Sequence, residues 1–143
     1  MRQVERSALV PYPAEAMFDL VADIGSYPAF LPGCTAARVR PGDGGCVIGT
    51  MVLAQGPLSL EFSTRNELER PTRIGMTLLD GPFRVLEGAW EFRPLGDAGC
   101  RVSLRLQFAF RNGATELLLG PFFESICNRL VDAFVRRARD KAR

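Results

Sequence analysis

The segment GPFFESICNRLVDAFVRRARDKAR, residues 120–143, decides the fold predicted for this chain. We predict one long helix over Pro121–Lys141, and Gly120-Pro121 either starts this helix or kinks a longer one. The apolar face of this helix is wide, and a curved sheet would cover it better than one neighbouring helix. Its apolar residues recur at steps of three or four, as on one side of an amphipathic helix; they are Leu119, Phe123, Ile126, Leu130 and Phe134, widened by Phe122, Val131 and Val135.

The opposite side of the same helix is polar and becomes basic at its end. Cations in the last turn interact favourably with the negative end of the helix dipole. The pattern has two interpretations, a solvated helix end or a basic docking patch. The candidate patch consists of Arg136, Arg137, Arg139, Lys141 and Arg143.

Length and composition are those of an ordinary globular protein. The chain has 143 residues, 47% hydrophobic residues and a net charge of +2, so we expect one domain over residues 1–143. No apolar run approaches the roughly 18 to 20 residues of a membrane span, and the N-terminus, MRQVERSALV, is too polar for a signal peptide. We expect a cytoplasmic protein that touches an anionic inner membrane at most peripherally.

The absence of histidine narrows the possible chemistry most. It removes Ser–His and Cys–His nucleophilic pairs, histidine metal ligands and histidine general bases together. Any enzyme would depend on carboxylates, arginine or tyrosine. The four cysteines lack metal-ligand spacing and are interpreted as small core residues; they are Cys34, Cys46, Cys100 and Cys127.

The start of the chain alternates and then becomes helical. Residues 2–10 predict a strand, and residues 13–24 predict a short amphipathic helix. The stretch SYPAFLPGC, residues 26–34, has room for a single helical turn before its Pro-Gly pair ends it. Its apolar side chains either plug one end of the core or form a lid over a cavity mouth; they are Tyr27, Phe30 and Leu31.

From residue 35 to residue 110 the apolar period changes to two residues, which predicts strands joined as hairpins. Turn sequences such as PGDGG, DGP and PLGDAG separate the segments. Gly88 lies among large side chains, which indicates either a bulge or a close approach of another group to its backbone. The predicted strands cover residues 35–41, 45–55, 58–68, 73–80, 83–93 and 100–110.

A strand, two short helices, six strands and a long helix follow one another, so the predicted fold class is α+β. The economical arrangement is a curved seven-stranded antiparallel sheet wrapped around the long C-terminal helix. A sheet bent this far rarely closes completely on one helix. The gap would form a pocket between the helix and the concave face, where small ligands commonly bind.

Several stretches resemble a known family: RSALVPYPAE, SYPAFLPGC, FSTRNEL, LLDGPFRVLEGAWEF and VDAFVRRA. They span the chain and are similar to the START-like, or Bet v 1-like, helix-grip fold, in its coenzyme-Q-binding and RatA-type ribosome-association toxin branch. The resemblance implies a non-enzymatic protein with two alternative activities. One is binding of ubiquinone or a similar polyprenyl lipid between helix and sheet, in support of respiration. The other is binding of the large ribosomal subunit, which blocks subunit association.

A lipid site needs a long apolar lining with few charges, and the inward faces of the predicted elements offer one. Each buried CH₂ group of an isoprenoid tail would contribute about 0.8 kcal/mol. The same residues would equally make a closed, solid core. The candidate lining residues are Tyr27, Phe30, Leu31, Leu60, Phe62, Met76, Leu78, Phe83, Leu86, Trp90, Phe108, Phe110, Phe122, Phe123 and Ile126.

The arginine content supports the ribosome interpretation. Of the 18 basic residues only Lys141 is a lysine, and guanidinium groups bind phosphates through bidentate contacts. Acidic residues are nearly as numerous, at 16, whereas a dedicated RNA binder is usually more basic. We expect no DNA partner. Arginines that fall in predicted strands or turns include Arg65, Arg84, Arg101, Arg105 and Arg111.

An enzyme of the polyketide cyclase or dehydratase type is the third possibility, because the fold class includes such enzymes. It would need convergent polar groups in the pocket, and the sequence offers only three isolated candidates, Arg84, Glu87 and Tyr27. A shared fold does not by itself imply a shared activity. We therefore expect no catalytic residues, no metal and no cofactor other than a bound ubiquinone or isoprenoid lipid.

Overall fold

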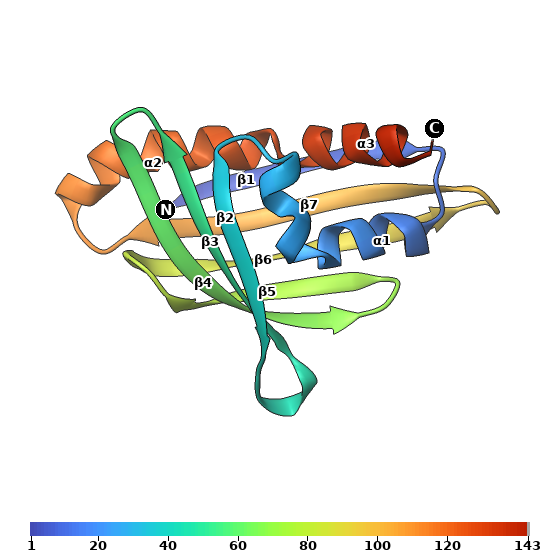
Figure 1. Ribbon diagram of the computed structural model, residues 1–143, viewed down its shortest axis with the longest axis horizontal. Helices are drawn as coiled ribbons and strands as arrows, with labels where there is room; N and C mark the ends of the chain where they lie inside the picture. The colour runs from blue at the N-terminus through green and yellow to red at the C-terminus, as the bar shows by residue number, and fades with distance from the viewer. Residues whose placement is uncertain (143) are drawn as a thin grey trace.

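The structure, a computed structural model, describes residues 1–142 and has the predicted α+β class. Seven antiparallel strands form one sheet in the order β1-β7-β6-β5-β4-β3-β2. The sheet curves around two C-terminal helices that lie end to end (Figure 1). The strands are β1 (Arg2–Val10), β2 (Cys34–Pro41), β3 (Val47–Gln55), β4 (Leu58–Glu69), β5 (Arg73–Asp80), β6 (Phe83–Leu95) and β7 (Gly99–Phe110). The helical elements are α1 (Ala14–Ala22), η1 (Ile24–Ala29), η2 (Asp43–Gly45), α2 (Gly113–Asn128) and α3 (Leu130–Lys141).

The strands follow the predicted periodicity closely. β5 has the predicted bounds, and the other predicted strand ends differ by at most two residues. At Gly88 the carbonyl oxygen of Arg105 on β7 occupies the space that a Cβ atom would need. The irregularity of β6 lies instead between Phe83 and Val85. Of the two interpretations of Gly88, the close approach is therefore confirmed.

The C-terminal helix starts earlier than Pro121 and is divided in two. α2 begins at Gly113, because the side-chain oxygen of Asn112 accepts a hydrogen bond from the Thr115 backbone N–H at 2.8 Å and caps the helix. Pro121 lies inside α2 on its exposed side, where water can bond the carbonyl that proline leaves without a partner. The predicted single helix is also wrong at Arg129, where α2 ends and α3 begins, so that the segment forms two helices.

One half of the core is a solid cluster of aromatic rings between the sheet and α2. Neighbouring ring centroids lie 4.5 to 6.3 Å apart, mostly in edge-to-face geometry, which aromatic pairs prefer. This phenylalanine cluster consists of Phe62, Phe83, Phe108, Phe110 and Phe123. It packs α2 against the concave face, and two of its members, Phe62 and Phe123, also border an internal cavity.

The side chain of Arg2 ties β1 to α2. Arg2 Nε donates to Glu116 Oε2 at 2.6 Å, and Nη1 donates to Glu124 Oε1 at 2.8 Å. Gly120 makes room for these bonds, since a Cβ atom there would overlap the Glu116 carboxylate and lie 2.7 Å from Arg2 Nε. The hydrogen bond from Arg2 holds the pKa of Glu116 below its ordinary value. These bonds join the edge strand β1 to α2, although the two elements are far apart in the sequence.

Candidate functional site

An apolar cavity of about 70 Å³ lies between the helices and the concave face of the sheet. Sites for drug-sized ligands usually measure about 300 to 1,000 Å³, so this cavity has space for a few waters or a very small molecule. It is lined by Tyr27, Leu31, Pro32, Met51, Leu53, Phe62, Thr64, Met76, Leu86, Glu87, Trp90, Leu104, Leu106, Phe123, Ile126, Cys127, Leu130 and Phe134.

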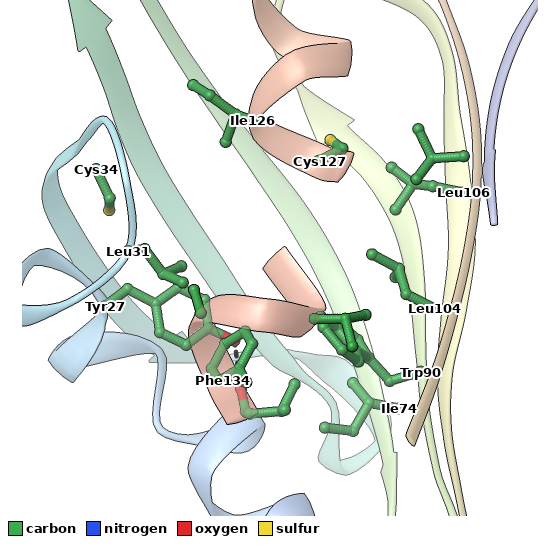
Figure 2. Packing of buried hydrophobic residues seen from close by; sticks show 14 of the residues in the cluster. Tyr27, Leu31, Cys34, Ile74, Trp90, Leu104, Leu106, Ile126, Cys127 and Phe134 are labelled. Carbon is green, nitrogen blue, oxygen red and sulfur yellow. Dashed lines mark hydrogen bonds between the residues drawn. The ribbon is translucent and has the colours of Figure 1, made fainter. Parts of the chain in front are cut away.

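Phe134 of α3 stands at the centre of this region. Figure 2 shows Tyr27 and Leu31 on one side of Phe134 and Trp90 of β6 on the other. The Phe134 ring centroid lies 5.3 Å from that of Tyr27 and 5.2 Å from that of Trp90. The Tyr27 hydroxyl donates to the Val21 carbonyl, and burial raises the pKa of Tyr27. Tyr27 is therefore a neutral, fixed part of the wall.

A second cavity of about 50 Å³ adjoins the first and is also lined by Tyr27, Met51, Met76 and Trp90. Methionine side chains are flexible, so small rotations of Met51 and Met76 would join the two spaces. The joined space would run from α3 to the far end of the sheet. Both cavities thus belong to one candidate ligand site.

The second cavity has a polar end formed by β4. Thr64 and Asn66 follow Phe62 at steps of two and line this end of the site. Asn66 is 3% exposed, and its side-chain oxygen accepts a hydrogen bond from the Thr64 hydroxyl at 3.1 Å. A buried amide beside an apolar space gives a ligand one polar group to orient against.

The structure brings together part of the predicted lining. Residues that line the first cavity are Tyr27, Leu31, Phe62, Met76, Leu86, Trp90, Phe123 and Ile126. Residues that lie outside the lining are Leu60, Phe83, Phe108, Phe110 and Phe122, which are buried in the core, and Leu78 and Phe30, which are half-buried. A role in ligand binding stays a prediction for all of them.

Phe30 lies at the surface of the segment that was predicted either to plug the core or to form a lid. Its ring centroid is 5.2 Å from that of Phe134, and the guanidinium carbon of Arg137 lies 4.9 Å above the ring. Such cation–π contacts are worth about 0.5 to 1 kcal/mol at exposed sites. The contact holds the segment after η1 against α3, and it engages one arginine of the predicted docking patch.

Several residues of the lining were not predicted from the sequence, among them Met51, Thr64, Cys127 and Phe134. The signal for Thr64 was present, because it lies two residues after Phe62 and therefore shares its inward face. Thr64 was not included because only apolar residues were taken as candidates for the lining. Phe134 was recognised as part of the apolar helix face, but the helix break at Arg129 decides which neighbours it meets.

Of the three isolated candidates for catalysis, Tyr27 and Glu87 contribute to the lining of the first cavity and Arg84 does not. Arg84 and Glu87 are exposed, and Glu87 accepts a hydrogen bond from Gln107. The Tyr27 hydroxyl is already bonded to the Val21 carbonyl. Within residues 1–142 no group of three or more Asp, Glu, Cys or His side chains could hold a metal ion.

The cysteines have the buried positions predicted for them. All four are free thiols inside the fold. Burial raises the pKa of Cys34, Cys100 and Cys127, so these thiols stay protonated and unreactive.

The predicted basic patch lies on α3 among acidic neighbours. Arg136, Arg139 and Lys141 are exposed, whereas Arg137 is half-buried at Phe30. Arg143 lies outside the described residues. Two aspartates of the same helix, at positions 132 and 140, are also exposed and dilute the positive charge. The patch stays a prediction.

A larger hollow of about 600 Å³ lies on the opposite, outer face of the sheet. Part of its floor is the short side chain of Ala89 and the backbone of Gly75, over which the guanidinium group of Arg73 lies. Sequence analysis did not predict this hollow, since it depends on the register of β5 against β6. The charged residues around it are Glu5, Arg65, Glu67, Arg73, Glu87, Glu91 and Arg105.

Residues 10–135 match the family described as "Polyketide cyclase / dehydrase and lipid transport". The chain belongs to this family. Its fold is START-like, with the seven-stranded curved antiparallel sheet and long C-terminal helical segment that the sequence predicted. Within residues 1–142 no helix is both long and apolar enough to span a bilayer.

The curated relatives include proteins named as ribosome association toxins and a coenzyme Q-binding protein. The chain is 42% identical over 140 residues to "Ribosome association toxin RatA" of Escherichia coli (strain K12), covering 98% of this chain and 89% of that protein. It is 43% identical over 136 residues to the protein of the same name from Pseudomonas aeruginosa, covering 95% and 94%. It is 23% identical over 145 residues to a mitochondrial coenzyme Q-binding protein of Drosophila melanogaster, covering 99% of this chain and 60% of that protein.

Solved structures share the architecture at lower identity. The aromatase/cyclase Zhui from Streptomyces sp. R1128 superposes with a TM-score of 0.84 at 18% identity, over 99% of this chain and 96% of that chain. An 18 kDa protein from Caulobacter crescentus gives a TM-score of 0.77 at 29% identity, over 99% of both chains. Likeness to the cyclase at this identity shows the fold alone.

Proposed function

We propose that this protein binds the ribosome and hinders the association of its subunits. The observation that carries the proposal is 42% and 43% identity, over nearly the whole chain, to proteins named for ribosome association. The coenzyme Q-binding relative shares only 23% identity. The ribosome interpretation, which the sequence left as the alternative, is therefore better supported than the ubiquinone interpretation.

The geometry supports a binding protein whose surface carries the activity. The internal cavities measure only about 70 and 50 Å³, and the two candidate polar groups in their lining, Tyr27 and Glu87, already have hydrogen-bond partners within the protein. A rigid domain of this kind would act by occupying a site that the other subunit needs, without chemistry. The partner of this proposal is the large subunit in the cytoplasm, as the family resemblance implies.

Sedimentation tests the proposal directly. The purified protein would be mixed with dissociated bacterial ribosomal subunits and centrifuged through sucrose gradients at low and high salt. We expect it to migrate with large subunits at low salt, to leave them at high salt because phosphate contacts are screened, and to reduce the yield of joined ribosomes. Small subunits alone are the control. A protein that stays at the top of the gradient at low salt would refute the proposal.

Binding of a small apolar ligand is a second candidate function, favoured by the two adjoining cavities and the buried amide of Asn66. A ubiquinone would require the site to widen severalfold, so we infer a preference for compact ligands over long polyprenyl tails. Organic extraction of the purified protein followed by mass spectrometry tests this inference. Stoichiometric ubiquinone would overturn the preference, and a compact apolar compound would support it.

A further inference from the structure

The outward side of β7 presents a line of hydrogen-bond donors to solvent. Arg101, Ser103 and Arg105 occupy alternate positions, so their side chains leave the same face of the sheet. At about 3.4 Å per residue, the two arginines stand roughly 13 Å apart along the strand. Both arginines are exposed, and the one bond that either makes to a described side chain is a 3.4 Å contact from Arg101 to the Ser7 hydroxyl.

Arg93 of β6 stands directly opposite Arg101 in the antiparallel register. Like charges at such positions repel and destabilise the sheet. Among residues 1–142 neither guanidinium has a carboxylate within the 4.0 Å of an ion pair. Other arginines of the chain do have one, for example Arg70 with Asp19 at 2.9 Å. Two facing guanidiniums without a counter-ion form a site that an external anion would stabilise.

The hollow on the outer face continues from this donor line. Arg105 and Gln107 of β7 belong to its rim, and its floor is formed by β5 and β6, with the Arg73 guanidinium lying over Gly75. Its volume of about 600 Å³ lies in the range of sites for small organic groups. Two carboxylates of β6, Glu87 and Glu91, line the hollow; Glu87 already accepts one hydrogen bond from Gln107, and the remaining carboxylate oxygens are acceptors for amino and imino hydrogens. The unpaired guanidiniums require an anion, and the hollow requires a small group with hydrogen-bond donors. An anionic chain that carries planar, hydrogen-bonding groups meets both requirements.

We propose that the outer face of β1, β7 and β6 binds a single-stranded segment of RNA, with phosphates on the Arg93, Arg101 and Arg105 guanidiniums and one extruded nucleobase in the hollow. This inference rests on the proposed ribosome association and names the surface that performs it. Unstacked bases are recognised through their edges and by stacking on guanidinium planes, and Arg105 supplies such a plane at the rim of the hollow. The acidic residues of the hollow weaken nonspecific binding of RNA. In this proposal Glu87 and Glu91 accept hydrogen bonds from the edge of the nucleobase.

The test compares three double variants that remove equal charge. R93T/R101T alters the proposed site, R38T/R40T removes two exposed arginines from the edge strand β2, and R136Q/R139Q removes two from α3. Each is measured for cosedimentation with purified large subunits and for fluorescence anisotropy with short single-stranded RNA of each base. Thermal midpoints are recorded for all variants.

We expect R93T/R101T to bind large subunits about tenfold more weakly, and the slope of log K against log salt to fall by about 0.7 for each arginine. Its thermal midpoint should stay equal or rise, because a repulsive pair has been removed. A structural role would instead lower the midpoint together with the binding. R38T/R40T should bind like the unaltered protein.

The other outcomes are decisive. If the unaltered protein fails to bind subunits, the proposed function itself is refuted. If it binds and R93T/R101T binds equally well, or only R136Q/R139Q loses binding, this inference alone is overturned. If R93T/R101T loses the subunit while the unaltered protein ignores every RNA, the surface contacts ribosomal protein, and the RNA assignment is overturned.

Discussion

Replacing Cys127 with leucine should stabilise the protein, although it enlarges a buried side chain. Cys127 is 2% exposed at the end of α2 and lines the larger internal cavity. Leucine is also the better helix former of the two residues. Overpacking usually destabilises a core, so a gain in stability would be specific to a site with empty space beside it.

The size of the gain follows from the volume of the cavity. Empty core volume costs about 24 cal/mol for each Å³, so about 70 Å³ corresponds to roughly 1.7 kcal/mol. Leucine cannot fill the whole space, and its rotamer has to fit between Leu130 and Phe134. We therefore expect the free energy of unfolding to rise by about 1 kcal/mol.

Equilibrium unfolding in urea measures this change, and Cys100→Leu is the matched control. Cys100 is 0% exposed and lines neither internal cavity, so the same substitution should overpack the core there and cost about 1 to 3 kcal/mol. Opposite signs for the two variants would support the cavity. Equal destabilisation of both would show that the space beside Cys127 is already filled and would refute the reasoning.

Three further predictions concern the fold. Arg2 holds the pKa of Glu116 below its ordinary value, so the ion pair contributes fully to stability above the unfolded pKa of about 4.3. This contribution is lost as the pH falls through the lower folded pKa. Between about pH 6 and about pH 3, the free energy of unfolding measured in urea should therefore fall less for R2A than for the unaltered protein. Asn112→Ala removes the cap of α2 and should cost about 1 kcal/mol in the same assay. Gly88→Ala brings a Cβ atom against the Arg105 carbonyl of the adjacent strand and should cost at least about 2 kcal/mol; an unchanged thermal midpoint would contradict this.

The sheet could be predicted from the sequence because its signals are local. Alternating side chains and glycine-rich turns fix strand, face and hairpin, and β5 was obtained without error. The start of the helix at Gly113 was missed because Pro121 is a stronger helix-boundary signal than Asn112, although proline is tolerated on an exposed helix face. The break at Arg129 has no comparable signal in the sequence.

The sites could be predicted only in part, because they depend on distances between elements. Alternation places Phe62 and Phe83 on the inward face, but only their packing against Phe123 shows that this half of the core is solid. In the same way, Arg101 was noted in the sequence only as a separate charge, and Arg93 was not singled out. Their direct opposition depends on the hairpin register.

The two candidate sites lie on opposite faces of one sheet, which makes their roles separable. Leu104 and Leu106 of β7 face the internal cavity, while Arg101 and Arg105 of the same strand face solvent. Substitutions that share no partners usually have additive effects.

If the cavity is only an imperfection of the core, Cys127→Leu should change stability and leave ribosome association unaltered. If a ligand in the cavity controls the curvature of the sheet, the same substitution should also shift RNA affinity, and combining it with R93T/R101T should give a non-additive result. The double-mutant cycle therefore decides whether ligand binding and ribosome association are two functions or one.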